Sequence, residues 1–519
     1  MSEHLAAKLW DLAQNTPVEV DIGARKVLLV RDGDHVHALA ATCPHRGVPL
    51  SKGAVAAGRL ICPAHRAIFD LASGEVMAPP ACENLARYDV RIADGEVHVR
   101  LPDNAEEHPL PAMARKGDDP RRFVIIGSGA AGWRAAETLR REGFAGEVLV
   151  LSDEPHGPLD RIDLSKAYLK GDDPDTPLVR SDEARKSLDI ELRQGEAASI
   201  DTVNHEVVMA HSHERIGYDR LLIATGSDAR RLDVEGTGLA GIHLLRRLKD
   251  ADSLRSDLAA QLAKGPCRVA IIGGGFIGLE VATVLSGKDN VKVTVILNEA
   301  RPLERQFGRD FAARIQSEHE DAGVRFVTSA RVCGFAGGSR VSQVNLNDGD
   351  PVEADLVLVA VGAVPRTAWL PFHVQEDGGI HVADDLSVPE HPHVFLAGDI
   401  ARIPTLWGPQ RIEHWRFAQE TGELAARNML GQGRHYESTP YFWTMQQAKG
   451  SYSYTGHALE WDSIRGAPEG SKFAMEFVHD GKTEAVLALG FDDAVTLVER
   501  RMAGKGPLPH PDLGLSHGD

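Results

Sequence analysis

Hydrophobic and polar residues alternate over short runs through the first hundred positions of the chain. Val27-Leu28-Leu29-Val30 and Val90-Arg91-Ile92 are two such runs, and turn signals at Asp32-Gly33 and Asp94-Gly95 separate runs from their neighbours. Short apolar runs bounded by Asp-Gly pairs predict strands joined by tight turns. We therefore expect a small antiparallel β domain at the N-terminus.

After residue 120 the pattern changes to strand, glycine-rich turn and helix, and this order occurs twice. Phe123-Val124-Ile125-Ile126 is a continuous apolar run, and a helical stretch over 133–142 follows it. The second copy begins with an apolar run over 269–272, continues with a helix from Leu279 and ends in a strand over 291–297. Buried strands that alternate with helices predict two α/β domains of the Rossmann type.

Each of the two apolar runs leads into a Gly-x-Gly-x-x-Gly sequence. The glycines are Gly127, Gly129 and Gly132 in the first copy and Gly273, Gly275 and Gly278 in the second. Alone this sequence is a weak signal, but between a strand and a helix it is a dinucleotide fingerprint, because glycines let the backbone approach the pyrophosphate. Glu154, about 20 residues beyond the first fingerprint, is expected to bind ribose hydroxyls. Two fingerprints predict two bound dinucleotides.

Two pairs of cysteine and histidine lie in the predicted β domain. They are Cys43 and His45, spaced C-x-H, and Cys62 and His65, spaced C-x-x-H. In a Rieske [2Fe–2S] centre two thiolates hold one iron and two imidazoles hold the other. The same residue types also fit a zinc site or two unrelated loops, so residue types alone leave three alternatives.

The surroundings of these pairs resemble the Rieske ferredoxin pattern C-P-H-x-G-x-x-L followed by C-P-x-H-x-x-x-F-D. Here Gly47 and Leu50 follow the first pair and Phe69-Asp70 follows the second. The resemblance implies that Cys43, His45, Cys62 and His65 hold a [2Fe–2S] cluster. Arg66 is a departure, because the family usually has glycine at this position.

Three further motifs surround the second fingerprint. Ala224-Thr225-Gly226 lies between the fingerprints, and Gly362 and Gly398-Asp399 follow the second one. This set resembles the FAD-dependent pyridine-nucleotide reductases over residues 121–519. In that family the first fingerprint binds FAD, the second binds NAD(P)H and the Gly-Asp pair contacts the flavin.

The chain also resembles a narrower group, the ferredoxin reductases that serve oxygenases. The motifs that it shares with this group are Leu159-Asp160-Arg161 and Leu164-Ser165-Lys166. Together with the N-terminal domain, the chain is similar to the Rieske-fused branch related to apoptosis-inducing factors. This resemblance implies catalytic roles for Lys166, its partner Glu280, and Trp443. It also implies that Arg161, His414 and Trp415 contact the cofactors.

The expected fold is therefore multidomain: an all-β Rieske domain, two Rossmann-like α/β domains and a C-terminal α+β domain. The expected ranges are 1–103 for the Rieske domain, 104–120 for a linker, 121–236 with 365–435 for the FAD domain, 237–364 for the NAD(P)H domain and 436–519 for the C-terminal domain. Cysteine is absent between Cys82 and Cys267. A redox dithiol beside the flavin is thereby excluded, because thiol exchange needs two nearby sulfurs.

The charge and composition of the chain argue against some classes of binding partner. The chain has 519 residues and a formal net charge of −18, which argues against nucleic acid and anionic membranes as partners. No run reaches the length of a membrane span, and the N-terminus has no signal-peptide pattern. The five cysteines suit a reducing compartment, so we expect a cytoplasmic protein that is a monomer or a homodimer.

The predicted function is electron transfer from NADH through FAD to the Rieske cluster and on to an external one-electron acceptor, such as an oxygenase, a cytochrome or a ferredoxin. Two alternatives stay open: an NADH oxidase or quinone-type reductase, and an NADH-responsive interaction protein. Glu299, just after the second strand of the NAD(P)H domain, favours NADH, whereas Arg301 could instead meet the 2′-phosphate of NADPH.

Overall fold

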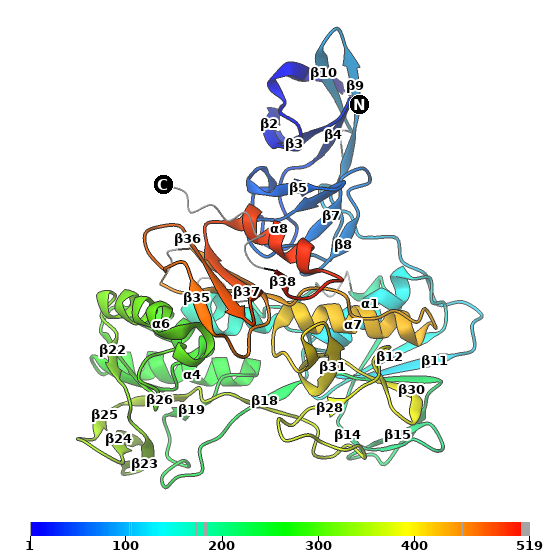
Figure 1. The fold of residues 1–519 in the computed structure, drawn as a ribbon. Coiled ribbons are helices and arrows are strands. Elements are labelled where there is room, and N and C mark those ends of the chain that lie inside the picture. The colour runs from blue at the N-terminus through cyan, green and yellow to red at the C-terminus, as the bar shows by residue number, and fades with distance from the viewer. Residues whose placement is uncertain are drawn as a thin grey trace.

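Four folded units make up the computed structural model of the chain, and the N-terminal unit stands above the other three (Figure 1). The structure describes residues 2–102, 104, 106–171, 175–180, 185–447 and 450–509. Residue 105 of the expected linker and residues 448, 449 and 510–519 of the expected C-terminal domain lie outside the described residues. The prediction of a multidomain fold with an all-β N-terminal unit and α/β units behind it is confirmed.

The N-terminal unit consists of two antiparallel sheets, with the orders β1-β10-β9-β4-β3-β2 and β5-β6-β7-β8. The apolar run Val27–Val30 forms the centre of its core, since all four side chains are fully buried. The elements are β1 Ser2–Lys8, η1 Leu9–Asp11, β2 Pro17–Ile22, β3 Arg25–Asp32, β4 His35–Ala40, η2 Leu50–Lys52, β5 Ala54–Ala56, β6 Arg59–Ile61, β7 Ile68–Asp70, β8 Val76–Ala78, β9 Arg87–Ala93 and β10 Glu96–Leu101.

The second unit is a parallel sheet in the order β13-β12-β11-β17-β30, with β29 antiparallel at its edge. Helices α1 and α7 pack on one face and against each other, and Gly422 permits this, because a Cβ there would lie 2.1 Å from the Ala131 carbonyl oxygen. The main elements are β11 Arg122–Ile126, α1 Ala130–Arg141, β12 Glu147–Ser152, β13 Glu191–Gln194, β17 Arg220–Ile223, β29 Ser387–Val388, β30 His391–Leu396 and α7 Trp415–Met429.

Short elements complete this unit around the sheet. They are η3 Arg161–Ser165, α2 Ala167–Lys170, β14 Ala197–Asp201, β15 Glu206–Met209, β16 Arg215–Gly217, β18 Ser227–Ala229, β27 Ala363–Pro365, β28 Ile380–His381, η4 Gly398–Ile400, β31 Ala401–Thr405 and β32 Gly408–Gln410. Side chains of β14, β15 and β16 share the core of the parallel sheet. The sheet takes its strands from two separate stretches of the chain, because β29 and β30 follow the whole of the third unit.

The third unit repeats the second on a smaller scale. Its parallel sheet has the order β19-β26-β20-β21-β22, and a three-stranded sheet β23-β24-β25 lies beside it. The elements are β19 Ile242–His243, α4 Leu248–Leu262, β20 Cys267–Ile272, α5 Phe276–Ser286, β21 Val291–Ile296, α6 Glu304–Asp321, β22 Arg325–Val327, β23 Val332–Gly337, β24 Val341–Leu346, β25 Val352–Glu353 and β26 Leu356–Val359.

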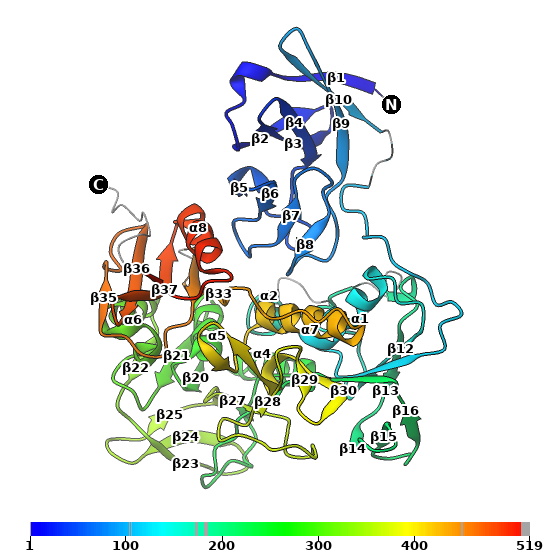
Figure 2. The same ribbon diagram turned by 45° about the vertical axis from the view of Figure 1, so that its right-hand side comes forward.

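The C-terminal unit is an antiparallel sheet in the order β33-β34-β37-β36-β35, with β38 beside β37 and helix α8 packed on β34 and β37. The elements are β33 Tyr441–Met445, β34 Ser451–Gly456, β35 Ser463–Arg465, β36 Phe473–His479, β37 Lys482–Leu489, α8 Asp492–Met502 and β38 Leu508–Pro509. Helix α8 also contacts β5, so this unit touches the N-terminal one (Figure 2).

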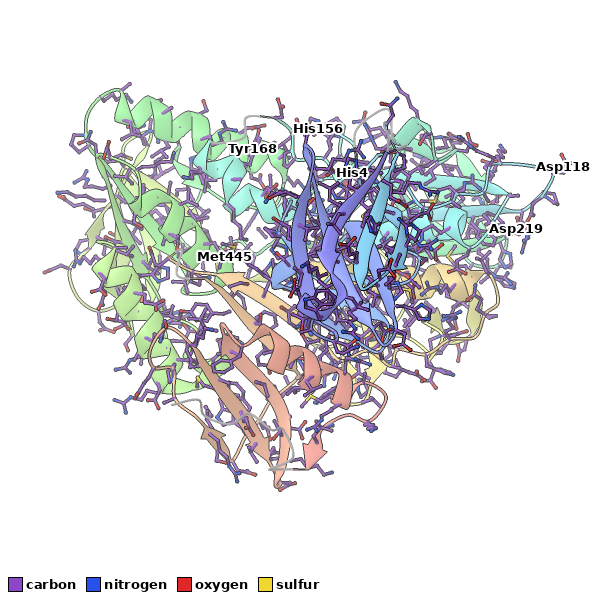
Figure 3. All side chains as sticks on the ribbon, turned by 90° about the horizontal axis from the view of Figure 1, so that it is seen from above. His4, Asp118, His156, Tyr168, Asp219 and Met445 are labelled. Carbon is purple, nitrogen blue, oxygen red and sulfur yellow. The ribbon has the colours of Figure 1, made fainter. Side chains whose placement is uncertain are left out.

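Seen from above, the N-terminal strands lie over the middle of the molecule, between the side that carries Tyr168 and Met445 and the side that carries Asp118 and Asp219 (Figure 3). The stretch predicted as a linker follows the surface of both units that it joins. Its residue Glu107 accepts a backbone hydrogen bond from Ala86 of the N-terminal unit. None of the helices among the described residues is both long enough and apolar enough to cross a membrane.

Candidate functional site

The two ligand loops of the N-terminal unit have the same backbone geometry. In the first loop the Gly47 amide donates to the Cys43 carbonyl at 2.8 Å, and in the second the Arg66 amide donates to the Cys62 carbonyl at 3.1 Å. Gly47 and Arg66 occupy equivalent positions, with φ of 65° and 63°. The second loop thus places an arginine in the left-handed region where the first has glycine, which a side chain with a Cβ enters only at a cost.

The four predicted ligands meet between these loops. The Nδ1 atoms of His45 and His65 lie 3.1 Å apart, close to the roughly 3.3 Å that separates two nitrogens bound at about 2 Å to one tetrahedral ion. Burial lowers the pKa of His45 to about 2 and that of His65 to about 4. Both rings are therefore neutral at pH 7, the form that binds a metal ion.

The two thiols of these loops also lie together. Cys43 and Cys62 are buried and contact each other, and the neighbouring Cys62 thiol together with burial raises the pKa of Cys43. Two buried thiolates side by side need a compensating cation, and bound iron supplies that charge. The described residues contain no group of three or more His, Cys, Asp or Glu arranged around a single ion. Two cysteines and two facing imidazoles fit a two-iron cluster.

Each glycine-rich fingerprint has two packed glycines and one open one. A Cβ on Gly127 would lie 2.3 Å from the Ala224 carbonyl oxygen, and one on Gly132 would lie 1.9 Å from the Gly127 carbonyl oxygen. A Cβ on the middle residue, Gly129, would meet no atom within 4 Å, and the cavity described next opens beside it. This is the space that a pyrophosphate needs at a helix N-terminus.

The second fingerprint has the same arrangement. Gly273 and Gly278 are packed, because a Cβ added to either would lie 2.3 Å from the nearest carbonyl oxygen. The middle glycine, Gly275, is open. Both middle glycines cap the helices that follow, α1 and α5. The residues present therefore fit two dinucleotides.

A single cavity of about 1230 Å³ connects the second, third and C-terminal units. It exceeds the roughly 300–1000 Å³ of an ordinary small-molecule pocket, so it has room for FAD and part of a second dinucleotide. The predicted residues that line it are Gly127, Gly129, Glu154, Arg161, Lys166, Ala224, Thr225, Gly226, Gly275, Glu280, Gly362, Gly398, Asp399, His414, Trp415 and Trp443. Gly132, Gly273, Gly278 and Glu299 do not line it.

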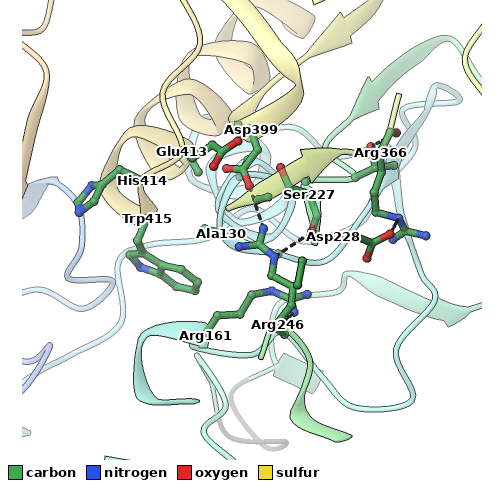
Figure 4. A pocket seen from close by; sticks show the side chains of 18 of the residues that line it. Ala130, Arg161, Ser227, Asp228, Arg246, Arg366, Asp399, Glu413, His414 and Trp415 are labelled. Carbon is green, nitrogen blue, oxygen red and sulfur yellow. Dashed lines mark hydrogen bonds and ion pairs between the residues drawn. The ribbon is translucent and has the colours of Figure 1, made fainter. Parts of the chain in front are cut away.

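Charged side chains inside the cavity are paired with one another. Arg161 binds both carboxylate oxygens of Glu154, at 3.2 and 3.0 Å. Arg246 binds the Asp399 carboxylate at 2.8 Å and the Ser227 carbonyl oxygen at 2.8 Å (Figure 4). The two-point contact fixes the orientation of Glu154, and Arg246 holds Asp399; both carboxylates line the same cavity as Gly129.

Sequence reasoning missed Arg246 and Arg366, which also line the cavity. Arg366 forms an ion pair with Asp153 at 3.0 Å. Neither arginine lies in a recognisable motif; the only signal was the pair of adjacent arginines, Arg246 and Arg247, before a helix. Their function in the site depends on a fold that brings distant loops together.

Lys166 and Glu280 meet inside the cavity. The Lys166 ammonium donates to Glu280 Oε2 at 2.7 Å, and the Ser165 hydroxyl donates to the same oxygen at 2.6 Å. Lys166 ends the short helix η3, and Glu280 lies on the first turns of α5. The pair therefore joins the FAD-type unit to the NAD-type unit and keeps a positive charge at the cavity wall.

An aromatic contact connects the cavity to the ligand loops. The ring centroid of Trp443 lies 4.7 Å from that of His65 and 4.9 Å from that of His414. Burial lowers the pKa of His414 to about 3, so it is neutral, and its Nδ1 accepts from the Arg416 amide at the start of α7. Trp443 thus touches a predicted iron ligand while it lines the cavity.

Two family models match the chain: the Rieske [2Fe-2S] domain over residues 2–89, and the pyridine nucleotide-disulphide oxidoreductase domain over residues 121–422. These matches place the two ligand loops in one domain and the two fingerprints in the other. They agree with the predicted fold class.

The chain is similar over almost its full length to apoptosis-inducing factor 3 of Homo sapiens, with 31% identity over 95% of this chain and 82% of that protein. The ferredoxin–NAD(+) reductase component of the biphenyl dioxygenase system of Paraburkholderia xenovorans is 34% identical over 73% of this chain and 94% of its own length. Among solved structures, the complex of putidaredoxin reductase with putidaredoxin has a TM-score of 0.69 and 28% identity, over 76% of this chain and 95% of that one.

Proposed function

Because this chain belongs to the pyridine nucleotide-disulphide oxidoreductase family and carries a Rieske [2Fe–2S] domain in front of it, we propose that it passes electrons from NADH through FAD to its own cluster and on to an external acceptor. The protein is an oxidoreductase whose cofactors are FAD, NAD(P)H and a [2Fe–2S] cluster. FAD, when bound, accepts a hydride from the nicotinamide and releases electrons one at a time.

The contact of Trp443 with His65 is the observation that supports this proposal most strongly. It joins the wall of the dinucleotide cavity to a proposed iron ligand through two rings in contact. Cys43, His45, Cys62 and His65 would hold the cluster. Glu154, Arg161 and Asp399 would hold FAD with the glycines of the first fingerprint, and the glycines of the second fingerprint would hold NAD(P)H.

An anaerobic stopped-flow experiment tests the proposal directly. NADH is mixed with the purified protein, flavin absorbance is followed, and samples are frozen for electron paramagnetic resonance of the reduced cluster. Flavin bleaching followed by a cluster signal supports the proposal. Flavin bleaching with no cluster signal, together with fast NADH oxidation in a parallel aerobic assay, would contradict it in favour of an oxidase.

Lys166→Ala is expected to slow the reduction of flavin by NADH at least about tenfold, because a fixed charge beside the reacting centre is removed from a preorganised site. The Lys166 ammonium is held by Glu280, and the variant leaves that carboxylate without its cation. The rate of flavin bleaching in stopped flow measures the effect. Lys170→Ala, which changes an exposed lysine on the next turn, is the matched control, and equal rates in the two variants would remove Lys166 from the reaction.

NADH is the expected donor, since Glu299 lies close behind the end of β21, where the family's acidic residue usually binds the ribose hydroxyls; that position itself is Leu297 or Asn298 here. Glu299 is exposed and lies outside the central cavity, where the adenosine end of a dinucleotide would lie if its nicotinamide reached Lys166. Glu299→Gln is expected to raise the KM for NADH roughly tenfold, about 1.5 kcal/mol for a lost charged hydrogen bond, without changing kcat. Steady-state kinetics with NADH and NADPH measure this, and a preference for NADPH would assign the ribose end to Arg301 instead.

The external acceptor is proposed by its chemistry. Several related reductases are named as components of dioxygenase systems or as ferredoxin reductases, so a ferredoxin or an oxygenase component is the acceptor that we propose. The cysteines of the described structure are all free thiols, which suits the reducing cytoplasm that we propose as the location. A monomer and a homodimer both fit this proposal.

A further inference from the structure

Three loops of the N-terminal domain, two of them the ligand loops, are bound to the reductase through arginine side chains. In the first loop Arg46 donates to Asp160 and Asp163, at 2.7 and 2.8 Å. Asp160 is the N-cap of η3 and Asp163 lies within this helix, which leads into Lys166. The first ligand loop is therefore tied to the wall of the flavin cavity.

The second loop is fixed by Arg66, whose side chain is 2% exposed. Its guanidinium binds the Thr496 hydroxyl and, at 2.5 Å, the Glu499 carboxylate, both on α8. The same guanidinium lies 5.0 Å from the ring centroid of Tyr441 on β33. Tyr441 is two residues from Trp443, so the arginine next to His65 contacts the strand that carries the tryptophan.

Glu499 also belongs to the reductase core. Its second oxygen accepts from Arg416 of α7 at 3.0 Å. Burial opposes ionisation of Glu499, but Arg66 and Arg416 together lower its pKa. Arg416 also pairs with Glu420 at 2.8 Å, so two carboxylates share two guanidinium groups, and loss of Arg66 leaves one buried negative charge uncompensated. Arg66 thus completes a charge cluster that the reductase cannot satisfy alone.

The third loop follows Pro79-Pro80 and lies on α1. Arg180 donates to the Cys82 carbonyl oxygen at 3.0 Å and pairs with Glu83. Arg134 of α1 donates to the Ala81 carbonyl oxygen at 3.4 Å. Arg134 and Arg180 also form ion pairs with Glu423 and Glu137 of the FAD-type unit. The two arginines therefore bind the backbone of this loop to that unit.

The backbone of Arg66 gives an independent reason to assign it a role. Its φ of 63° falls where the equivalent residue of the first loop is Gly47. A bulky side chain there strains the backbone, and such strain is kept where the residue has a function. Arginine at this position reaches α8, which glycine could not do.

From these contacts we propose that the Rieske domain stays docked throughout turnover, and that Arg66 is the positioning residue that holds the His65 loop against Trp443. The proposal rests on the proposed function, since it concerns the step from flavin to cluster. The stretch 104–120 is then a strap along both domains rather than a hinge. An external acceptor takes its electron from the docked cluster, not from a cluster that has swung outward.

The first test raises the solvent viscosity about fivefold with sucrose and follows cluster reduction after anaerobic mixing with NADH. If the domain had to swing in each turnover, its motion through solvent would limit the rate, and the rate would fall as the viscosity rises. A docked domain gives a rate that changes less than about twofold. Slowing in proportion to viscosity would overturn the proposal. Small-angle scattering of the holoenzyme before and after reduction supplies a readout independent of electron flow: the radius of gyration stays constant if the domain is docked and grows if it swings out.

The second test uses Arg66→Gly, which relieves the backbone strain and so preserves the ligand loop while it removes the contacts with α8. The variant is expected to keep its cluster and its rate of flavin reduction, but to reduce the cluster at least about tenfold more slowly, as small misplacements of a reacting group do. Its cluster step also becomes dependent on viscosity, and its radius of gyration increases. Glu499→Gln, which leaves the ligand loop untouched, is expected to slow the same step.

Arg91→Gly is the matched control, because Arg91 forms an exposed ion pair with Glu3 inside the Rieske domain, away from the reductase. Cluster reduction in Arg66→Gly at the rate of the control would overturn the assignment of Arg66. A wild-type protein in which NADH reduces the flavin but never the cluster would instead contradict the proposed function, and the scattering measurement would still decide whether the domain is docked.

Discussion

Cys43→Ser is expected to abolish the NADH-dependent reduction of a one-electron acceptor while leaving the reduction of flavin by NADH unchanged. Cys43 is fully buried in contact with Cys62, so its loss leaves one thiolate for an iron that needs two. Even changes in outer-shell groups cost about 10–100-fold in metal affinity, and this variant changes a ligand itself. We expect acceptor reduction to fall by more than about 100-fold.

Two measurements check this expectation. The paramagnetic signal of the reduced cluster disappears from the variant, and turnover with an artificial one-electron acceptor falls with it, while stopped-flow bleaching of the flavin keeps its rate. Cys333→Ser is the control, since Cys333 is an exposed thiol in the third unit. If Cys43→Ser lacked the cluster but still reduced the acceptor quickly, the flavin would be delivering electrons directly and the cluster would not be on the route.

The sequence predicted most of what local chemistry determines. The alternating pattern around Val27–Val30 predicts an all-β unit, and each Gly-x-Gly-x-x-Gly sequence predicts a strand, a turn and a helix, because these features depend on neighbouring residues. The spacing of Cys43 and His45, and of Cys62 and His65, predicts that each pair shares one loop, and the resemblance to Rieske ferredoxins turns the four residues into a predicted cluster. These expectations needed no knowledge of the tertiary arrangement.

The docking of the Rieske domain could not be predicted in this way. Arg66 and Thr496 are 430 residues apart in the chain, and no periodicity links them. From the sequence Arg66 is only a departure from a glycine, whereas the structure shows the side chain crossing into another domain. The pairing of Arg246 with Asp399 was missed for the same reason, since 153 residues separate them. Contacts between domains depend on how complete surfaces fit, which a local pattern does not encode.

The 104–120 stretch shows a second limit of prediction from the sequence. Its composition, rich in proline and charge, predicts a linker, and the described part has no helix or strand. However, its backbone is bonded to both domains: the Pro109 carbonyl accepts from Asn84, and the Ala114 amide donates to Arg140. Absence of periodicity predicts absence of regular structure, but it does not predict freedom to move.

Gly129→Val is the second substitution expected to have a large effect, and it should yield a protein that binds FAD much more weakly. The backbone at Gly129 is extended, with φ of −71°, and a Cβ there meets no protein atom within 4 Å. Valine is therefore compatible with the fold, but its side chain fills the space of the pyrophosphate. A forced misfit of this size costs about 1–3 kcal/mol, so FAD affinity should fall roughly 10- to 100-fold.

Gly275→Val is the matched variant, because Gly275 has the same extended backbone, with φ of −83°, and the same open surroundings in the second fingerprint. It is expected to keep FAD and to raise the KM for NADH by a similar factor. The ratio of flavin to protein in the visible spectrum measures the first effect, and steady-state kinetics measure the second. If Gly129→Val retained a full complement of FAD while Gly275→Val lost it, the two nucleotides would occupy the fingerprints in the opposite order, and the contact of Trp443 with His65 would no longer connect the flavin site to the cluster.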